Sequence, residues 1–222
     1  MLRIQAVTVG PFQSNCYVVA CAETNDAVIF DAGDEAARIL ATVRAMGVNV
    51  KAVVNTHAHI DHVSGLAGVV DALGVPVFMH RDEAPIYDAL AQTALMFGLP
   101  VPRKVEIHRW LAEGEVIRVG NVPGRVMLMP GHTPGHIIVL FDEETPPRAI
   151  VGDVLFQGSI GRTDLPGGDH AVMMETLERF LAMPDDTVVY PGHGPETTIG
   201  VEKKWNPFLA PLARHARPPG SD

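Results

Sequence analysis

Four potential metal ligands lie within six consecutive residues, in the segment His57-Ala58-His59-Ile60-Asp61-His62. In an extended or looped segment, residues two apart point to the same side. His57, His59 and Asp61 can therefore converge, while His62 faces a neighbouring position. One tetrahedral ion cannot easily use all four of these side chains, whereas two adjacent ions can. The hexapeptide predicts a site for two metal ions, and the alternative is a chance cluster of histidines on a polar loop.

Three later segments repeat one pattern, in which an apolar strand runs into a turn that carries a ligand-type side chain. They are Gly131-His132-Thr133-Pro134-Gly135-His136, Ile150-Val151-Gly152-Asp153 and Tyr190-Pro191-Gly192-His193-Gly194-Pro195. Strands that end together at one edge of a sheet commonly build a site on the loops that follow them. These partners argue against a chance cluster. They must also meet in space, so we expect a single domain over residues 1–217, with 218–222 as a disordered tail.

The hexapeptide and its three partner segments resemble the metallo-β-lactamase superfamily and, within it, the glyoxalase II (hydroxyacylglutathione hydrolase) branch, particularly its short bacterial members. The resemblance implies an α/β fold, a four-layer αβ/βα sandwich of two mixed β-sheets flanked by helices. It also implies two divalent metal ions, with zinc preferred and iron or manganese as alternatives. The implied ligands are three residues for each ion and one bridging carboxylate: His57, His59 and His132; Asp61, His62 and His193; and Asp153.

The activity that this resemblance implies is thioester hydrolysis, which converts S-D-lactoylglutathione to D-lactate and glutathione. Asp61 would also be the catalytic residue that orients the attacking hydroxide. A thiolate leaving group needs little protonation, so no separate general acid is required. Arg162 stands where the family has a basic contact to a glutathione carboxylate, although it could instead pair with Asp164. Lys203 and Lys204 are further candidate substrate contacts.

Other functions remain open from the sequence. A persulfide dioxygenase of the same superfamily would hold one iron on His57, His132 and Asp153, a set of two histidines and one carboxylate. A lactonase and a non-catalytic binding scaffold are weaker alternatives. The Pro-Gly-His-Gly-Pro turn at residues 191–195 has the form found in the two-metal hydrolases. We expect His136 to be structural, and Asp31 either to orient the hexapeptide loop or to form a plain turn.

Composition limits the partners. The net charge is −9 and the sequence has no basic stripe, which argues against nucleic acid. No apolar run approaches the roughly 20 residues of a membrane span, and the first residues lack the pattern of a signal peptide. Cys16 and Cys21 should point to opposite faces of a strand and stay reduced. We therefore expect a cytoplasmic monomer or small homo-oligomer that binds a small thioester, a glutathione conjugate.

Hydrophobic periodicity and turn residues predict alternating strands and helices. The expected strands are 2–9, 15–20, 26–30, 50–55, 75–79, 115–119, 125–129, 136–141, 149–152 and 187–190. The expected helices are 35–46 with Asp34 as its cap, 62–73 ended by Gly74, 82–97, 170–182, and a short helix after the last metal loop.

Overall fold

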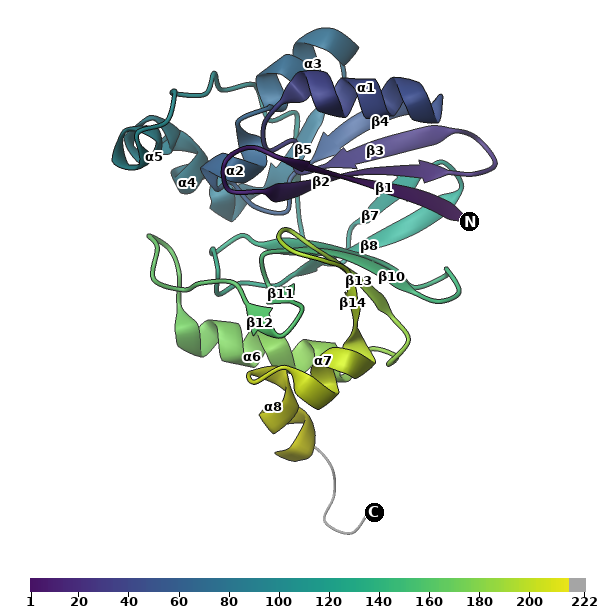
Figure 1. Ribbon diagram of the computed structural model, residues 1–222, viewed down its shortest axis with the longest axis vertical. Coiled ribbons are helices and arrows are strands. Elements are labelled where there is room, and N and C mark those ends of the chain that lie inside the picture. Colours follow the sequence, from purple (N-terminus) through teal and green to yellow (C-terminus); the bar gives the residue numbers. More distant parts are fainter. Residues whose placement is uncertain (216–222) are drawn as a thin grey trace.

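The computed structural model describes residues 1–215. Two six-stranded mixed sheets face each other, and helices cover the outer face of each sheet (Figure 1). The predicted four-layer α/β sandwich is confirmed. The predicted tail over 218–222 and the predicted domain end at 217 lie outside the described residues.

The first sheet has the strand order β1-β2-β3-β4-β5-β6. Neighbours are antiparallel from β1 to β3 and parallel from β3 to β6. The bounds of its strands are Leu2–Val9, Ser14–Cys21, Asp26–Phe30, Asn49–Val54, Val77–His80 and Arg109–Leu111. The helices of this half are α1 Ala36–Met46, α2 Ile60–Val63, α3 Leu66–Leu73, η1 Arg81–Glu83, α4 Ala84–Asp88 and α5 Leu90–Phe97.

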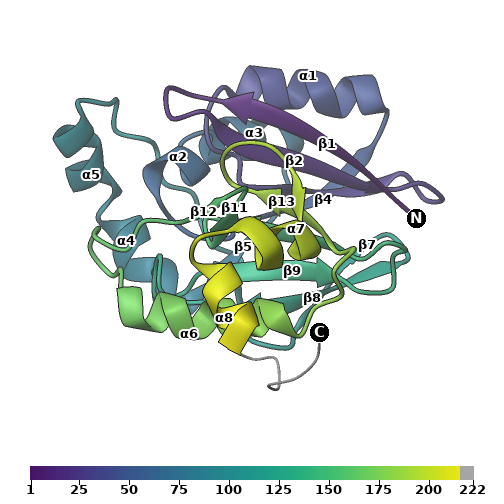
Figure 2. The same ribbon diagram turned by 60° about the horizontal axis from the view of Figure 1, so that its bottom comes forward.

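The second sheet has the order β14-β13-β10-β9-β8-β7, in which only β10 and β13 are parallel neighbours within the described chain. Its strands are β7 Val116–Val119, β8 Val122–Leu128, β9 Ile137–Phe141, β10 Arg148–Gly152, β13 Val188–Pro191 and β14 Thr197–Thr198. A separate hairpin joins β11 Leu155–Phe156 to β12 Ser159–Ile160. Helices α6 His170–Leu181, α7 Ile199–Trp205 and α8 Leu209–His215 lie on the outer side of this half (Figure 2).

Strand β2 shows how the layers are held together, because it is buried on both faces. Cys16 packs with the core beneath the helices of the first sheet, and Cys21 packs with the core between the two sheets. Both thiols are unpaired, so the predictions of opposite faces and of reduced cysteines are confirmed. Between the sheets, the rings of Phe30 and Phe141 meet edge to face, with centroids 6.5 Å apart.

Two expected helices are broken, and one expected cap is wrong. The helix predicted over 62–73 is divided into α2 and α3, because the N–H of Gly65 turns to the carbonyl oxygen of Ala32 at 2.9 Å. A Cβ at Gly65 would also lie 2.9 Å from that oxygen, so only glycine fits there. Gly74 ends α3 as predicted. Helix α1 begins after Glu35, and no side chain caps it.

The helix predicted over 82–97 consists of η1, α4 and α5. The strands that periodicity missed are β6, β11, β12 and β14, which are two or three residues long and too short to show alternation. Within the described residues, no helix is both long enough and apolar enough to cross a membrane.

Candidate metal centre

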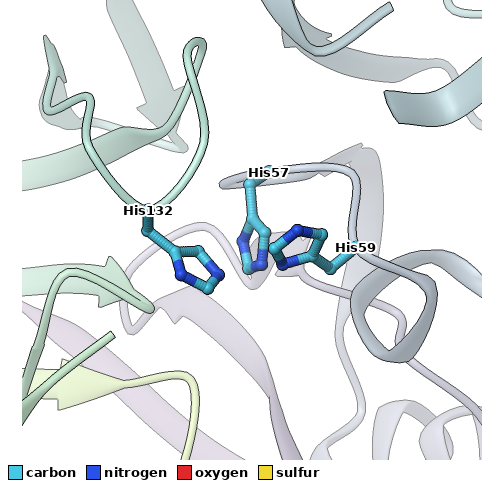
Figure 3. A group of neighbouring side chains, drawn as sticks. All are labelled: His57, His59 and His132. Carbon is cyan, nitrogen blue, oxygen red and sulfur yellow. The ribbon is translucent and has the colours of Figure 1, made fainter. Parts of the chain in front are cut away.

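The predicted ligands follow strands of both sheets and meet at one place; Asp61 and His62 lie on helix α2, and the others lie on loops. His57 and His59 follow β4, His132 lies between β8 and β9, Asp153 follows β10, and His193 follows β13. Figure 3 shows His132 approaching His57 and His59 from the opposite side. The loops of both halves are therefore needed to assemble the site.

Among the described residues, ligand atoms of three side chains lie close together in three groups. One of them, Asp31, His57 and His62, overlaps both of the others, which have no member in common and which we call the first and second groups. In the first, one ring nitrogen from each of His57, His59 and His132 lies within 4.8 Å of the other two. In the second, the same criterion joins Asp61, His62 and His193. The two groups have the same members as the ligand sets that the family resemblance implied, and their binding of metal stays a prediction.

Asp153 lies between the two groups. Its Oδ2 is 3.6 Å from His132 Nε2, and its Oδ1 is 3.4 Å from His62 Nε2. Its Oδ2 is also 3.4 Å from Nε2 of His193. One carboxylate therefore faces ligands of both groups, as a bridging residue must.

The donor atoms fit a metal. In the described chain, four buried polar atoms of these groups have no hydrogen-bond partner: Nε2 of His57, His62 and His132, and Oδ1 of Asp153. Buried polar atoms are almost always satisfied, because leaving them unpaired costs free energy. Imidazole nitrogens and a carboxylate are the ligands that zinc, iron and manganese accept. A metal ion held by these groups would supply the missing partner.

The other nitrogen of each buried ring is held by the protein. His57 Nδ1 lies 3.0 Å from Thr56 Oγ1, His62 Nδ1 lies 3.1 Å from Asp31 Oδ2, and His132 Nδ1 lies 2.7 Å from the carbonyl oxygen of Arg162. Such contacts fix the orientation of a ligating imidazole. All three rings are therefore anchored with Nε2 free.

The electrostatic environment differs between the groups. Burial lowers the pKa of His57, and it lowers the pKa of His59 to about 3, so both imidazoles are neutral and keep a lone pair for a metal. Burial also opposes the charged form of His62, but Asp153 and Asp61 outweigh it and raise the pKa of His62 to about 9. The negative charge of the site is concentrated at the second group.

Asp31 orients the hexapeptide loop from behind, which was one of its two predicted roles. It is buried with φ of 54°, in the left-handed region that only a few non-glycine residues adopt. Its Oδ1 accepts the N–H of Thr56 at 2.7 Å, and its Oδ2 accepts the Thr56 hydroxyl and faces His62. With this backbone conformation, the Asp31 carboxylate contacts Thr56, which precedes the hexapeptide, and His62, which ends it.

His193 is held close to Asp153 by its neighbours. The N–H of Gly192 donates to the carbonyl oxygen of Gly152 at 2.7 Å, which ties the last metal loop to the end of β10. A Cβ on Gly192 would lie 2.0 Å from Asp153 Oδ1, so this position requires glycine. The Asn15 side chain donates to the carbonyl oxygens on both sides, of Pro191 and Gly194. Strand β2 thereby positions a ligand that belongs to the other sheet.

His136, which the sequence assigned to a structural role, is absent from all three candidate ligand groups of the described chain. Its Nε2 accepts the backbone N–H of Asp153 at 3.0 Å. Its ring stacks on His57 with centroids 4.8 Å apart and an angle of 22°. His136 therefore positions both a ligand of the first group and the bridging carboxylate.

Glu83 is a residue that the sequence analysis missed. It is fully buried, and its Oε2 accepts the N–H of Ala58 at 2.7 Å while its Oε1 accepts the N–H of Gly135 at 2.8 Å. One carboxylate thus joins the loop of His57 and His59 to the loop of His132. Nothing in the local sequence marks it, because a glutamate near a helix start is ordinary.

A cavity of about 370 Å³ opens in front of the ligands. We call its two sides the first-sheet wall and the second-sheet wall, after the half of the fold that supplies them. The first-sheet wall consists of Phe12, Ile60, Thr93 and Phe97. The second-sheet wall consists of Phe156, Ser159, Ile160, Arg162 and Leu165.

The predicted substrate contacts are divided by this geometry. Arg162 lines the cavity, and its guanidinium pairs with both carboxylate oxygens of Asp164 at 2.7 and 2.8 Å. Lys203 and Lys204 line a different depression, of about 710 Å³, on the far side of the second sheet's helices. Lys203 is bonded there to Asp185 at 2.7 Å, and Lys204 lies over the Trp205 ring. Because neither lysine lines the cavity at the ligands, this placement corrects the expectation that they contact substrate.

The family model described as the metallo-beta-lactamase superfamily matches residues 9–193 of the chain. The chain belongs to this superfamily. Hydroxyacylglutathione hydrolase GloC of Haemophilus influenzae is 37% identical over 211 residues, which are 94% of this chain and 98% of that protein. The predicted superfamily and its glyoxalase II relationship are confirmed.

Two solved structures of the superfamily share the whole fold. The crystal structure of TTHA1623 in a di-iron-bound form is 40% identical with a TM-score of 0.84, covering 92% of this chain and 100% of the other. That of the BLEG-1 B3 metallo-beta-lactamase is 35% identical with a TM-score of 0.86, covering 93% and 99%. With these relatives and its His and Asp groups, the chain is a metal-dependent hydrolase of the superfamily.

Proposed function

We propose that this protein is a hydroxyacylglutathione hydrolase with two divalent ions, zinc by preference, and that it cleaves S-D-lactoylglutathione to D-lactate and glutathione. The observation that carries the proposal is the pair of adjacent ligand groups with Asp153 between them. The relationship to GloC supports the thioester substrate. The two unpaired cysteines agree with a reducing compartment, so the cytoplasm is part of the proposal.

The residues divide the chemistry among them. Metal ions held by the two groups would supply an activated water and polarise the thioester carbonyl. Asp61 lines the cavity, and the contact of its Oδ2 with His193 Nε2, at 3.1 Å, holds the carboxylate in place. Because it faces the cavity, this carboxylate can accept a hydrogen bond from the attacking water. The thiolate product leaves without a proton, which is why the cavity needs no additional acid.

The second ligand group favours a hydrolase over a mononuclear dioxygenase. A single iron would use only His57, His132 and Asp153. That arrangement would leave Asp61, His62 and His193 without a chemical role, although their ligand atoms lie within 4.8 Å of one another. A non-catalytic scaffold gives no reason to keep any of these groups.

The test is thiol release from a panel of thioesters by metal-loaded protein. The panel contains S-D-lactoylglutathione, acetylglutathione and the lactoyl thioester of N-acetylcysteamine. Hydrolysis of a β-lactam is also measured, because BLEG-1 is described as a B3 metallo-beta-lactamase. In a separate assay, oxygen uptake is followed with glutathione persulfide. We expect rapid release from the lactoyl thioesters and no oxygen uptake. Inert thioesters together with persulfide-dependent oxygen uptake would replace the hydrolase by the dioxygenase.

Arg162 provides a prediction about the thiol carrier. The Arg162–Asp164 pair is exposed, and exposed pairs are weak enough for a substrate carboxylate to replace one partner. We expect Asp164→Asn to lower KM for S-D-lactoylglutathione roughly two- to fivefold, and Arg162→Ala to raise it, with kcat little changed. The control is the N-acetylcysteamine thioester, which has no carboxylate and whose KM should not move. If both variants leave KM for the glutathione substrate unchanged, the pair only braces its loop.

A further inference from the structure

The first-sheet wall of the cavity is apolar although it is open to solvent. Phe12 and Phe97 are 40% and 41% exposed, and their rings meet edge to face with centroids 5.5 Å apart. Covering an exposed aromatic ring with apolar surface is favourable, because it removes that ring from water. Two half-exposed rings at the mouth of a cavity that contains the metal ligands are therefore suited to an apolar part of a substrate.

Both rings stand on ordered backbone. Phe12 lies in the turn between β1 and β2, which the N–H of Gln13 closes by donating to the carbonyl oxygen of Gly10 at 3.1 Å. Phe97 is the last residue of α5, and the N–H of Leu99 donates back to the carbonyl oxygen of Ala94 at 2.8 Å. The side chain of Leu99 packs against the core beneath the first sheet's helices. The pair is therefore a preformed surface, which binds with little loss of conformational entropy.

Charge is distributed unequally between the walls. Among the described residues that line the cavity outside the two ligand groups and Asp153, the charged side chain is Arg162, on the second-sheet wall. The first-sheet wall offers one hydroxyl, that of Thr93, and no cation. A carrier with carboxylates, such as glutathione, would lie along the Arg162 wall. The acyl side of the thioester would then face Phe12 and Phe97.

We propose that Phe12 and Phe97 form the acyl-binding surface of this hydrolase, and that it prefers 2-hydroxyacyl thioesters with an aromatic or branched apolar side chain over the lactoyl thioester. This inference rests on the proposed thioester activity. The methyl group of a lactoyl thioester is too small to cover either ring. A phenyl group in its place can pack against both.

The test uses two substrates that differ only at this group, S-mandeloylglutathione and S-D-lactoylglutathione. We expect kcat/KM to be about tenfold higher for the mandeloyl substrate, the gain from burying one aromatic ring. Phe12→Ala and Phe97→Ala should each lower kcat/KM severalfold more for the mandeloyl substrate than for the lactoyl substrate, which reduces the preference. Met96→Ala is the matched control, because Met96 is an exposed apolar residue of the same helix and does not line the cavity.

Binding of the products gives a readout that does not depend on turnover. Calorimetry on the metal-loaded protein should find mandelate bound more tightly than lactate, with the difference reduced in Phe97→Ala. The inference is overturned if the lactoyl thioester is cleaved but the two Phe variants lose activity equally on both substrates, or keep the preference. If no thioester is cleaved, the proposed function fails. The inference that Phe12 and Phe97 bind the acyl group would then hold only if mandelate still binds more tightly than lactate and Phe97→Ala removes the difference.

Discussion

Replacing Asp153 with Ala should lower the metal content of the candidate metal centre and abolish most of the activity. Wild-type protein purified under metal-replete conditions should contain about two transition-metal ions per chain, as two-metal hydrolases do. Asp153 faces ligands of both groups within 3.6 Å, so its loss should lower the occupancy of both. We expect thioester hydrolysis to fall roughly a thousandfold or more, because a ligand loss exceeds the 10- to 100-fold effect of an outer contact. Elemental analysis and thiol release measure the two effects separately.

Asp71→Asn is the matched control, since Asp71 is an exposed carboxylate that pairs with Arg103 and does not line the cavity. Its metal content and activity should equal those of the wild type. Thermal unfolding in the presence of a chelator should show that Asp153→Ala remains folded without metal. A wild-type protein that holds only one tightly bound ion under metal-replete conditions would contradict the two-ion mechanism.

Replacing Glu83 with Ala should reduce stability and metal affinity together. The substitution leaves the buried N–H groups of Ala58 and Gly135 without an acceptor. Each such loss costs about 1–3 kcal/mol, so the free energy of unfolding should fall by about 2–6 kcal/mol. The affinity of the group His57, His59 and His132 should fall by roughly 10- to 100-fold, because both of its loops lose their common support. Denaturant unfolding and a chelator titration are the measurements.

Glu83→Gln separates hydrogen bonding from mere packing. The amide has nearly the same shape, but only one of its two terminal atoms can accept an N–H, so stability should lie between those of the wild type and the Ala variant. Asp82→Ala serves as the neighbouring control, because that side chain is exposed and contacts neither loop backbone through its carboxylate. Equal metal affinity in the wild type and Glu83→Ala would show that each loop holds its own ligands without this bridge.

The sequence predicted those parts of the protein whose signal is local. His132, Asp153 and His193 each follow a short apolar strand and have a glycine beside them, and His57 follows the apolar end of β4, so residue type and spacing were enough to propose these four residues. The same holds for β2, where the odd spacing of Cys16 and Cys21 placed them on opposite faces because side chains alternate along a strand. These inferences need only a few neighbouring residues.

Local signals were less reliable where the chain meets another element. The helix predicted over 62–73 includes Gly65, but the contact of Gly65 with Ala32 divides that helix in two. The sequence left Arg162 with two possible partners, a substrate carboxylate and Asp164, and the structure pairs it with Asp164. Lys203 and Lys204 were near enough in sequence to be candidates, and the fold puts them on another surface.

By itself, the sequence determined the kinds of side chain available to the site, because ligand chemistry is a property of single residues and of the turns that display them. Only the tertiary structure decided which distant residues support and shape that site. Glu83 acts on backbone groups 25 and 52 residues away, and the rings of Phe12 and Phe97 meet at the mouth of the cavity. Contacts between such distant residues leave no periodic trace in a sequence, because they depend on how two sheets and their loops pack in space.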